Sequence, residues 1–150
     1  MPREHQLEAI KAVQEGFKAT DHGQLIMACG TGKTLTTLWV KETLDADSTL
    51  ILLPSLGLLS QTLHEWTKAA SKRFKVLCVC SDDCVGKKSE DESYDSVTQL
   101  PFPVTSDPQR IQAFLEFQKP KVVFSTYQSS PLVAEAQANQ QPQTVLSLLQ

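Results

Sequence analysis

The stretch that decides the fold is LIMACGTGKT, residues 25–34. An apolar run leads into a turn that contains Gly30 and Gly32, and residues of helical character follow Lys33 and Thr34. Glycine adopts backbone angles that other residues resist, so successive amide groups of such a turn can point at phosphate oxygens. The helix that follows adds the positive end of its dipole. This order of strand, turn and helix predicts a phosphate-binding loop.

The side chains of the loop have expected roles of their own. Lys33 can reach the β- and γ-phosphates of a nucleotide, and the hydroxyl of Thr34 suits a Mg²⁺ ion. The general loop pattern also has a glycine five positions before Gly32, where this chain has Met27. The alternative for this stretch is therefore an ordinary glycine turn after a strand.

The remainder of the chain alternates between strand-like and helix-like segments. Four short, almost continuously apolar runs predict strands that are covered on both faces: residues 24–28, 49–53, 75–80 and 121–126. Apolar residues at helical spacing lie between them: Leu59, Leu63, Trp66 and Ala70, and before the first run Ile10, Val13 and Phe17. Asp107-Pro108 and Ser130-Pro131 predict the starts of two further helices. We therefore expect one α/β domain over residues 1–150, with a parallel sheet flanked by helices.

The segment 81–106 differs from this pattern. It is acidic, contains Pro101 and Pro103, and shows no period, so we expect a surface insertion. The whole chain is 41% hydrophobic and carries a net charge of −3. This composition excludes wholesale disorder and a polybasic nucleic-acid coat, but not nucleic acid held by backbone amides and hydroxyls.

Four stretches resemble superfamily 2 helicases of the DEAD/DEAH type. MACGTGKT resembles motif I, PREHQLEAI resembles the Q-motif region, and LILLPSLGLLSQT resembles motif Ia. FSTYQS, residues 124–129, is similar to the strand end found near motif Ib. The resemblance covers most of residues 2–135 and is strongest for the helicase-like subunits of type I and type III restriction systems.

The resemblance implies a RecA-like P-loop NTPase fold and the N-terminal part of an ATP-dependent DNA helicase or translocase, with ATP and Mg²⁺ as cofactors. Gln6 would read the adenine edge, and Lys33 and Thr34 would be the catalytic residues, with Thr34 on the metal. Nucleic acid, DNA rather than RNA, would be the partner. The implied nucleotide-binding residues are Arg3, Gln6, Cys29, Gly30, Thr31, Gly32, Lys33 and Thr34. The implied nucleic-acid contacts are Ser55, Leu56, Gly57 and Thr126.

Parts of the helicase pattern do not occur in these 150 residues. No Asp-Glu motif follows Thr126, and neither motif III nor an arginine finger is found. We therefore expect the front part of a longer enzyme, an incomplete sheet and little turnover by this chain alone. In the family, the missing strands lie between the loop-bearing strand and those after motif Ia. We expect self-association, a domain swap, or a replacement strand from residues 145–149.

Two other functions remain open. VLCVCSDD, residues 76–83, ends near Asp82, which could serve a complete small P-loop phosphotransferase as its metal-binding acid. A nucleotide-binding or interaction module without turnover is the second alternative.

The cysteines and the N-terminal residues indicate the cellular compartment of the protein. The spacing of Cys78, Cys80 and Cys84 lacks a fourth ligand for structural zinc, so buried apolar roles are expected, with Cys78 and Cys80 on one face of a strand. MPREHQLEA has no apolar signal region, and no run reaches 18 apolar residues. We expect a cytoplasmic protein without a membrane partner.

Overall fold

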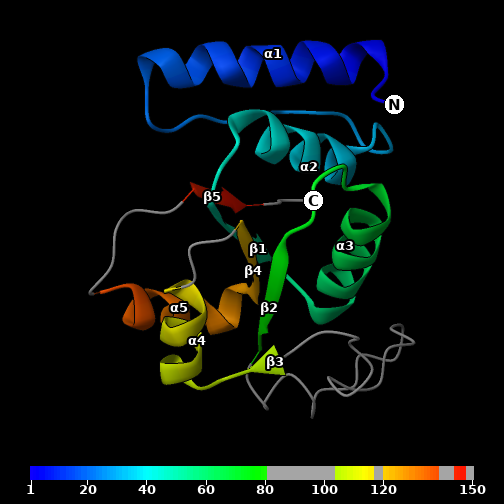
Figure 1. Cartoon of the computed structure of the whole chain (residues 1–150). Helices are drawn as coiled ribbons and strands as arrows, with labels where there is room; N and C mark the ends of the chain where they lie inside the picture. Colours follow the sequence, from blue (N-terminus) through cyan, green and yellow to red (C-terminus); the bar gives the residue numbers. More distant parts are fainter. Residues whose placement is uncertain (81–103, 117–119, 139–143, 148–150) are drawn as a thin grey trace.

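The computed structural model describes residues 1–80, 104–116, 120–138 and 144–147 (Figure 1). The first half of the chain forms α1 (Glu4–Ala19), α2 (Lys33–Leu44), β1 (Ser48–Leu53), α3 (Leu56–Ala69) and β2 (Lys75–Val79). The second half forms β3 (Val104–Thr105), α4 (Pro108–Leu115), β4 (Lys121–Thr126), the 3-10 helix η3 (Tyr127–Ser129), α5 (Ser130–Gln137) and β5 (Thr144–Ser147).

The described strands form one parallel sheet in the order β3-β2-β4-β1-β5. β4 is central, and β1 pairs with it along its whole length, from Ser48 opposite Lys121 to Leu53 opposite Thr126. Parallel neighbours need a crossover connection, and α3, α4 and α5 lie in the connections that precede β2, β4 and β5. The carboxyl ends of β1 and β4 therefore meet at one edge of the sheet.

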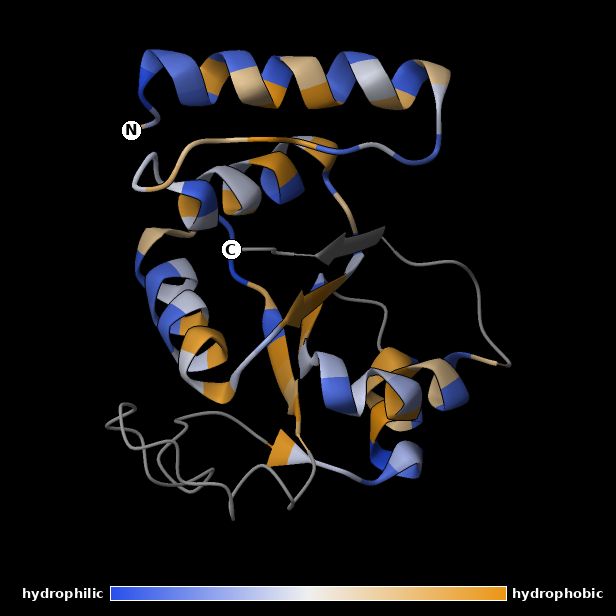
Figure 2. Ribbon diagram, turned by 180° about the vertical axis from the view of Figure 1, so that it is seen from behind, coloured by the Kyte–Doolittle hydropathy of each residue, from blue (hydrophilic) through white to orange (hydrophobic). Residues whose placement is uncertain are grey.

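Helices cover both faces of the sheet, and the side chains of each strand alternate between the two sides. On one face α2 and α3 bury Leu38, Leu59, Leu63 and Trp66 against strand residues such as Phe124. On the other face α4 and α5 bury Ile111, Leu115, Val133 and Ala136 against strand residues such as Val123. Figure 2 shows the hydrophobic residues concentrated in the strands and on the helix sides that face them. The predicted α/β class is confirmed.

Most predicted elements occur at or near their predicted bounds. The strand 121–126 is confirmed at the same bounds, 49–53 begins one residue earlier, and 75–80 ends at Val79. Asp107 caps α4, with its Oδ1 accepting a hydrogen bond from the Gln109 amide at 2.9 Å. At α5 the prediction is wrong by one residue, because Ser129 is the N-cap and Ser130 already belongs to the helix.

The predicted insertion is too long at its C-terminal end. Val104 and Thr105 pair with Cys78 and Val79 as β3, so these residues belong to the sheet. The preceding residues, 81–103, lie outside the described part.

The predicted strand at 24–28 is not formed. This segment pairs with none of the described strands, and Leu25 and Ile26 are 43% and 83% exposed. β5 instead pairs with β1, on the side away from β4, from Thr49 opposite Thr144 to Leu52 opposite Ser147. The expected replacement strand is thus confirmed for residues 145–147, while 148 and 149 lie outside the described part.

None of the described helices is long and apolar enough to cross a membrane.

Candidate functional site

The turn before α2 has the backbone geometry that its glycines predict. Gly30 and Gly32 have φ angles of 75° and 80°, in the left-handed region that strains any residue with a side chain. The hydroxyl of Thr31 donates to the carbonyl of Ala28 at 2.7 Å and closes the turn. Gly32 is the N-cap of α2, so Lys33 and Thr34 are its first two residues. The result is an amide-lined turn at the positive end of a helix.

The first turn of α2 is tied down by its own threonines. The hydroxyl of Thr36 donates to the Gly32 carbonyl at 3.0 Å, and that of Thr37 to the Lys33 carbonyl at 2.7 Å. Lys33 and Thr34 remain partly exposed. Their side chains are therefore accessible while their backbone is held.

Gln6, on α1, packs directly against the turn. Its side chain is 4% exposed, and its Nε2 donates to the carbonyls of Thr31 at 3.1 Å and Gly32 at 3.4 Å. Its Oε1 accepts a hydrogen bond from the backbone amide of Arg3 at 2.8 Å. Both ends of this buried amide are satisfied within the protein. The structure therefore brings Gln6 to the loop, and its contact with adenine stays a prediction.

Two features of this contact were missed in the sequence. His5 Nε2 lies 3.2 Å from the Thr31 carbonyl, and no motif pointed to it. Arg3 holds the Gln6 side chain through its backbone amide, while the Arg3 side chain is exposed. Both residues lie in the stretch PREHQLEAI that resembles the Q-motif region, and this is the signal that the sequence offers.

Two of the predicted nucleic-acid contacts, Ser55 and Thr126, lie at the carboxyl edge of the sheet. Ser55 follows β1 and caps α3, with its Oγ accepting from the Leu58 amide at 3.3 Å; Leu56 and Gly57 form the first turn. Thr126 ends β4 opposite Leu53. Its side chain is only 2% exposed, and its hydroxyl donates to Ser129 Oγ at 3.2 Å. Ser55 is available to a phosphate, whereas the hydroxyl of Thr126 is turned inward; both contacts stay predictions.

The glycine turn is not at that edge. The backbone carbonyl of Thr34 accepts a hydrogen bond from Trp66 Nε1 at 2.9 Å. Trp66 is eleven residues beyond Ser55, or roughly 16 Å along α3 at 1.5 Å per residue. Figure 1 accordingly shows α2 beside the end of α3 that leads into β2. The structure assembles the predicted nucleotide residues with one another but places them apart from Ser55 and Thr126.

The remaining candidates form no site in the described part. Cys78 and Cys80 are buried on the same face of the sheet, as predicted, and burial raises the pKa of the Cys78 thiol to about 12. Cys29 is exposed. The described residues contain no group of three or more His, Cys, Asp or Glu side chains that could hold a metal ion. Asp82 lies outside the described residues.

Comparison with known proteins gives the family. The family model described as "Type III restriction enzyme, res subunit" matches residues 1–146. Two solved structures are similar over nearly the whole chain. The first is a nuclease-deletion mutant of the Type ISP restriction-modification enzyme LlaGI in complex with a DNA substrate mimic, at 35% identity, 97% coverage of this chain and a TM-score of 0.76.

The second structure is the ATP-dependent Type ISP restriction-modification enzyme LlaBIII bound to DNA, at 31% identity, 95% coverage of this chain and a TM-score of 0.77. This chain spans 15% of the length of the first and 10% of the second. A search among curated proteins found no match.

The family match confirms the resemblance to the helicase-like proteins of restriction systems. The sheet and its flanking helices accordingly form a RecA-like domain of the superfamily 2 helicase type, in agreement with the solved structures. The chain belongs to the family of the type III restriction enzyme res subunit.

Proposed function

We propose that this chain is the ATP-binding portion of an ATP-dependent DNA helicase or translocase that works in restriction. The observation that carries this proposal is the turn at Gly30 and Gly32, which leads into α2 with Lys33 and Thr34 at its start. An amide-lined turn and a lysine at a helix start form a site for the phosphates of a nucleotide. LlaBIII is an ATP-dependent enzyme, which supports the same assignment.

Each loop residue would have its own role in nucleotide binding. The backbone amides from Cys29 to Thr34 would surround the phosphates, and Lys33 would neutralise the charge of the β- and γ-phosphates. Mg²⁺ prefers oxygen ligands and keeps several waters, so the hydroxyl of Thr34, a partly exposed residue, would fit it as a single protein ligand. The ion supplies charge neutralisation between the phosphates when bound. Arg3 and Gln6 would lie on the adenine side of the nucleotide.

DNA is the proposed polymer partner. LlaGI and LlaBIII are each described in complex with DNA or a DNA mimic, and Ser55 begins a helix whose first amides can face a phosphate. We place Ser55, Leu56, Gly57 and Thr126 on the DNA backbone. We also propose a cytoplasmic location, where restriction acts on incoming DNA.

Turnover by the 150 residues alone should be close to background. No Asp-Glu pair follows Thr126 in this chain, and charge stabilisation by metal-binding acids and arginines is most of phosphoryl-transfer catalysis. A small phosphotransferase that uses Asp82 would behave differently. It would show a Lys33-dependent rate of about 1 s⁻¹ or more, within the range of kinases.

Titration calorimetry with ADP and Mg²⁺ tests the proposal. Lys33→Ala should weaken binding by at least about tenfold, because the variant lacks the cation aimed at the phosphates. Lys18→Ala is the matched control, since Lys18 pairs with Glu15 on the exposed side of α1 and should leave affinity unchanged. Equal affinity in the unsubstituted chain and Lys33→Ala would reject the nucleotide site. Binding with no turnover, even after DNA is added, is also what a non-catalytic module would show, so the full-length protein must then be assayed.

A further inference from the structure

Trp66 is fixed in the core by two other aromatic rings. Its side chain is fully buried, and its ring meets Phe124 and Phe74 edge-on, at centroid distances of 5.5 and 6.2 Å and interplanar angles of 78° and 83°. Phe124 lies in β4 and Phe74 just before β2, and both pack with Trp66 in the core on one face of the sheet. The indole is therefore oriented by aromatic packing against β4 and the segment before β2, in a core cluster to which α2 contributes Leu38.

The polar edge of this ring points out of the aromatic cluster toward α2. Nε1 donates to the carbonyl of Thr34 at 2.9 Å, across 32 residues of sequence. A buried indole N–H needs a partner, and here the partner is the backbone of the second residue of α2. Thr34 follows Lys33 directly, so this hydrogen bond reaches the turn that carries both side chains proposed for the phosphates and the metal.

We propose that Trp66 is a positioning residue for the nucleotide site. Packing alone asks only for a large aromatic ring, which phenylalanine also supplies. The N–H group has a second effect. It fixes the position of the first turn of α2 relative to the sheet, and with it the positions of the amides and side chains of Lys33 and Thr34. This inference rests on the proposed nucleotide site, but it concerns a residue outside the glycine turn and outside α1.

Trp66→Phe separates the donor from the ring. The variant keeps the aromatic packing and leaves the Thr34 carbonyl without the indole partner. We expect ADP with Mg²⁺ to bind about five- to tenfold more weakly in calorimetry, the size of effect that one buried hydrogen bond produces. Circular dichroism must show that the variant is folded at the temperature used, so that the loss cannot come from unfolded chain.

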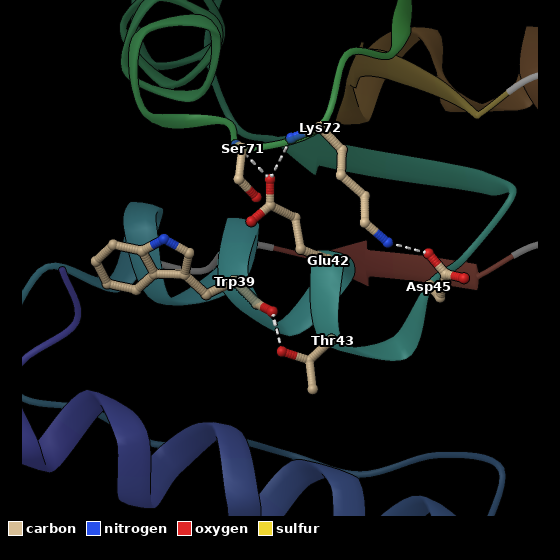
Figure 3. A network of polar contacts seen from close by, with 6 residues as sticks. All are labelled: Trp39, Glu42, Thr43, Asp45, Ser71 and Lys72. Carbon is tan, nitrogen blue, oxygen red and sulfur yellow. Dashed lines mark hydrogen bonds and ion pairs between the residues drawn. The ribbon is translucent and has the colours of Figure 1, made fainter.

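Trp39→Phe is the matched control. Trp39 lies on α2 and is partly exposed, and the hydrogen bond drawn at this residue in Figure 3 uses its backbone carbonyl, which accepts from Thr43 Oγ1 at 2.6 Å. The same chemical change at this position should leave affinity for ADP unaltered. If Trp66→Phe binds as tightly as Trp39→Phe and the unsubstituted chain, the positioning role is rejected while the nucleotide site stands.

A spectroscopic measurement decides the matter if Trp66→Phe fails to fold. The chain has two tryptophans, so Trp39→Phe leaves Trp66 as the single indole fluorophore. Titration with ADP and Mg²⁺ should change the emission of Trp66, with the dissociation constant found by calorimetry. The reason is that the nucleotide binds at Thr34, whose carbonyl accepts the hydrogen bond from the indole N–H. Unchanged emission at saturation would overturn the inference. No binding by the unsubstituted chain would reject the proposed function and the positioning role together.

Discussion

The side-chain amide of Gln6 occupies the space that a side chain at position 32 would need. A Cβ atom added to Gly32 would lie 2.6 Å from Gln6 Nε2, closer than real Cβ atoms come to any neighbour. Gly32 is thus constrained twice, by its φ of 80° and by the end of the Gln6 side chain, which would have to shift for a larger residue. Gly30, with a φ of 75°, has open space around it and is required only for its backbone.

This difference predicts how alanine substitutions behave at the two glycines. Gly30→Ala should lower the free energy of unfolding by about 1–2 kcal/mol, the cost of a left-handed backbone for an alanine. Gly32→Ala should lower it by about 1–3 kcal/mol more, because the new methyl group also displaces the Gln6 amide. Urea denaturation followed by circular dichroism measures both values.

A double-mutant cycle isolates the contact. In a Gln6→Ala background the extra cost of Gly32→Ala should disappear, so that both glycine substitutions cost about the same. Gly30→Ala should cost the same with and without Gln6. Independent, additive effects of Gln6→Ala and Gly32→Ala would contradict the contact between α1 and the turn.

The sequence predicts local turns and helix caps better than it predicts which strands pair. The glycine turn and the aspartate cap at Asp107 depend on residues a few positions apart, and both occur as expected. The run 24–28 depends instead on neighbours distant in the chain. Its apolar character indicates that it can be covered on both faces, but not which strands are present to cover it. The contact of Gln6 with Gly32 was likewise hidden, because 26 residues separate the two.

Glu42 joins the end of α2 to the loop after α3. Its Oε1 accepts hydrogen bonds from the backbone amides of Ser71 at 2.8 Å and Lys72 at 3.3 Å (Figure 3). Glu42→Ala should therefore lower the free energy of unfolding by about 1–2 kcal/mol, because two amides lose a charged acceptor. Thermal or urea denaturation at neutral pH provides the measurement.

Lys72→Ala is the control for Glu42→Ala. The Lys72 ammonium group lies 2.6 Å from Asp45 Oδ1, but both side chains are largely exposed. Exposed pairs contribute little, so this variant should change the free energy of unfolding by less than about 0.5 kcal/mol. A larger loss for Lys72→Ala than for Glu42→Ala would show that the ion pair, and not the carboxylate at the two amides, holds α2 to the loop.

The thiol of Cys78 predicts a loss of stability in alkali. Burial, with a smaller contribution from Cys80, raises the pKa of Cys78 from its ordinary value of 9.0 to about 12. The folded state keeps this proton more tightly than the unfolded state, so the thiol's contribution to stability is complete below pH 9 and declines as pH rises toward 12. The slope in that window is about 1.4 kcal/mol per pH unit.

Comparison with Cys78→Ala isolates this effect from other titrating groups. At pH 8 the alanine variant should be the less stable protein, because a buried sulfur is lost. At pH 10.5 the difference should shrink or reverse, since the variant has no thiol to ionise on unfolding. Cys29→Ala is the control for removal of a thiol, because Cys29 is exposed and Cys78 is buried. A constant difference for Cys78→Ala would mean that this thiol is not desolvated.

The exposed segment at Leu25 and Ile26 predicts self-association. Both side chains are exposed in a segment outside the described sheet, and β5 is the last strand at its end of that sheet. An apolar extended segment and an open strand edge are the two halves of a strand pairing between chains. Light scattering after size exclusion should show dimers or larger species that increase with concentration.

Ile26→Lys should weaken that association without weakening the fold. Ile26 is 83% exposed in the single chain, so the free energy of unfolding should change by no more than about 0.5 kcal/mol. Burying an isoleucine is worth about 1.5–3 kcal/mol, so the association constant should fall by about ten- to a hundredfold. Leu7→Lys is the control, since Leu7 is 46% exposed but lies on a helix, α1, and should have little effect. A chain that stays monomeric at every concentration would contradict this prediction, and so would equal effects of the two lysine substitutions. Either result would mean that residues 24–28 do not pair with an open strand edge and that the sheet with β5 needs no further strand.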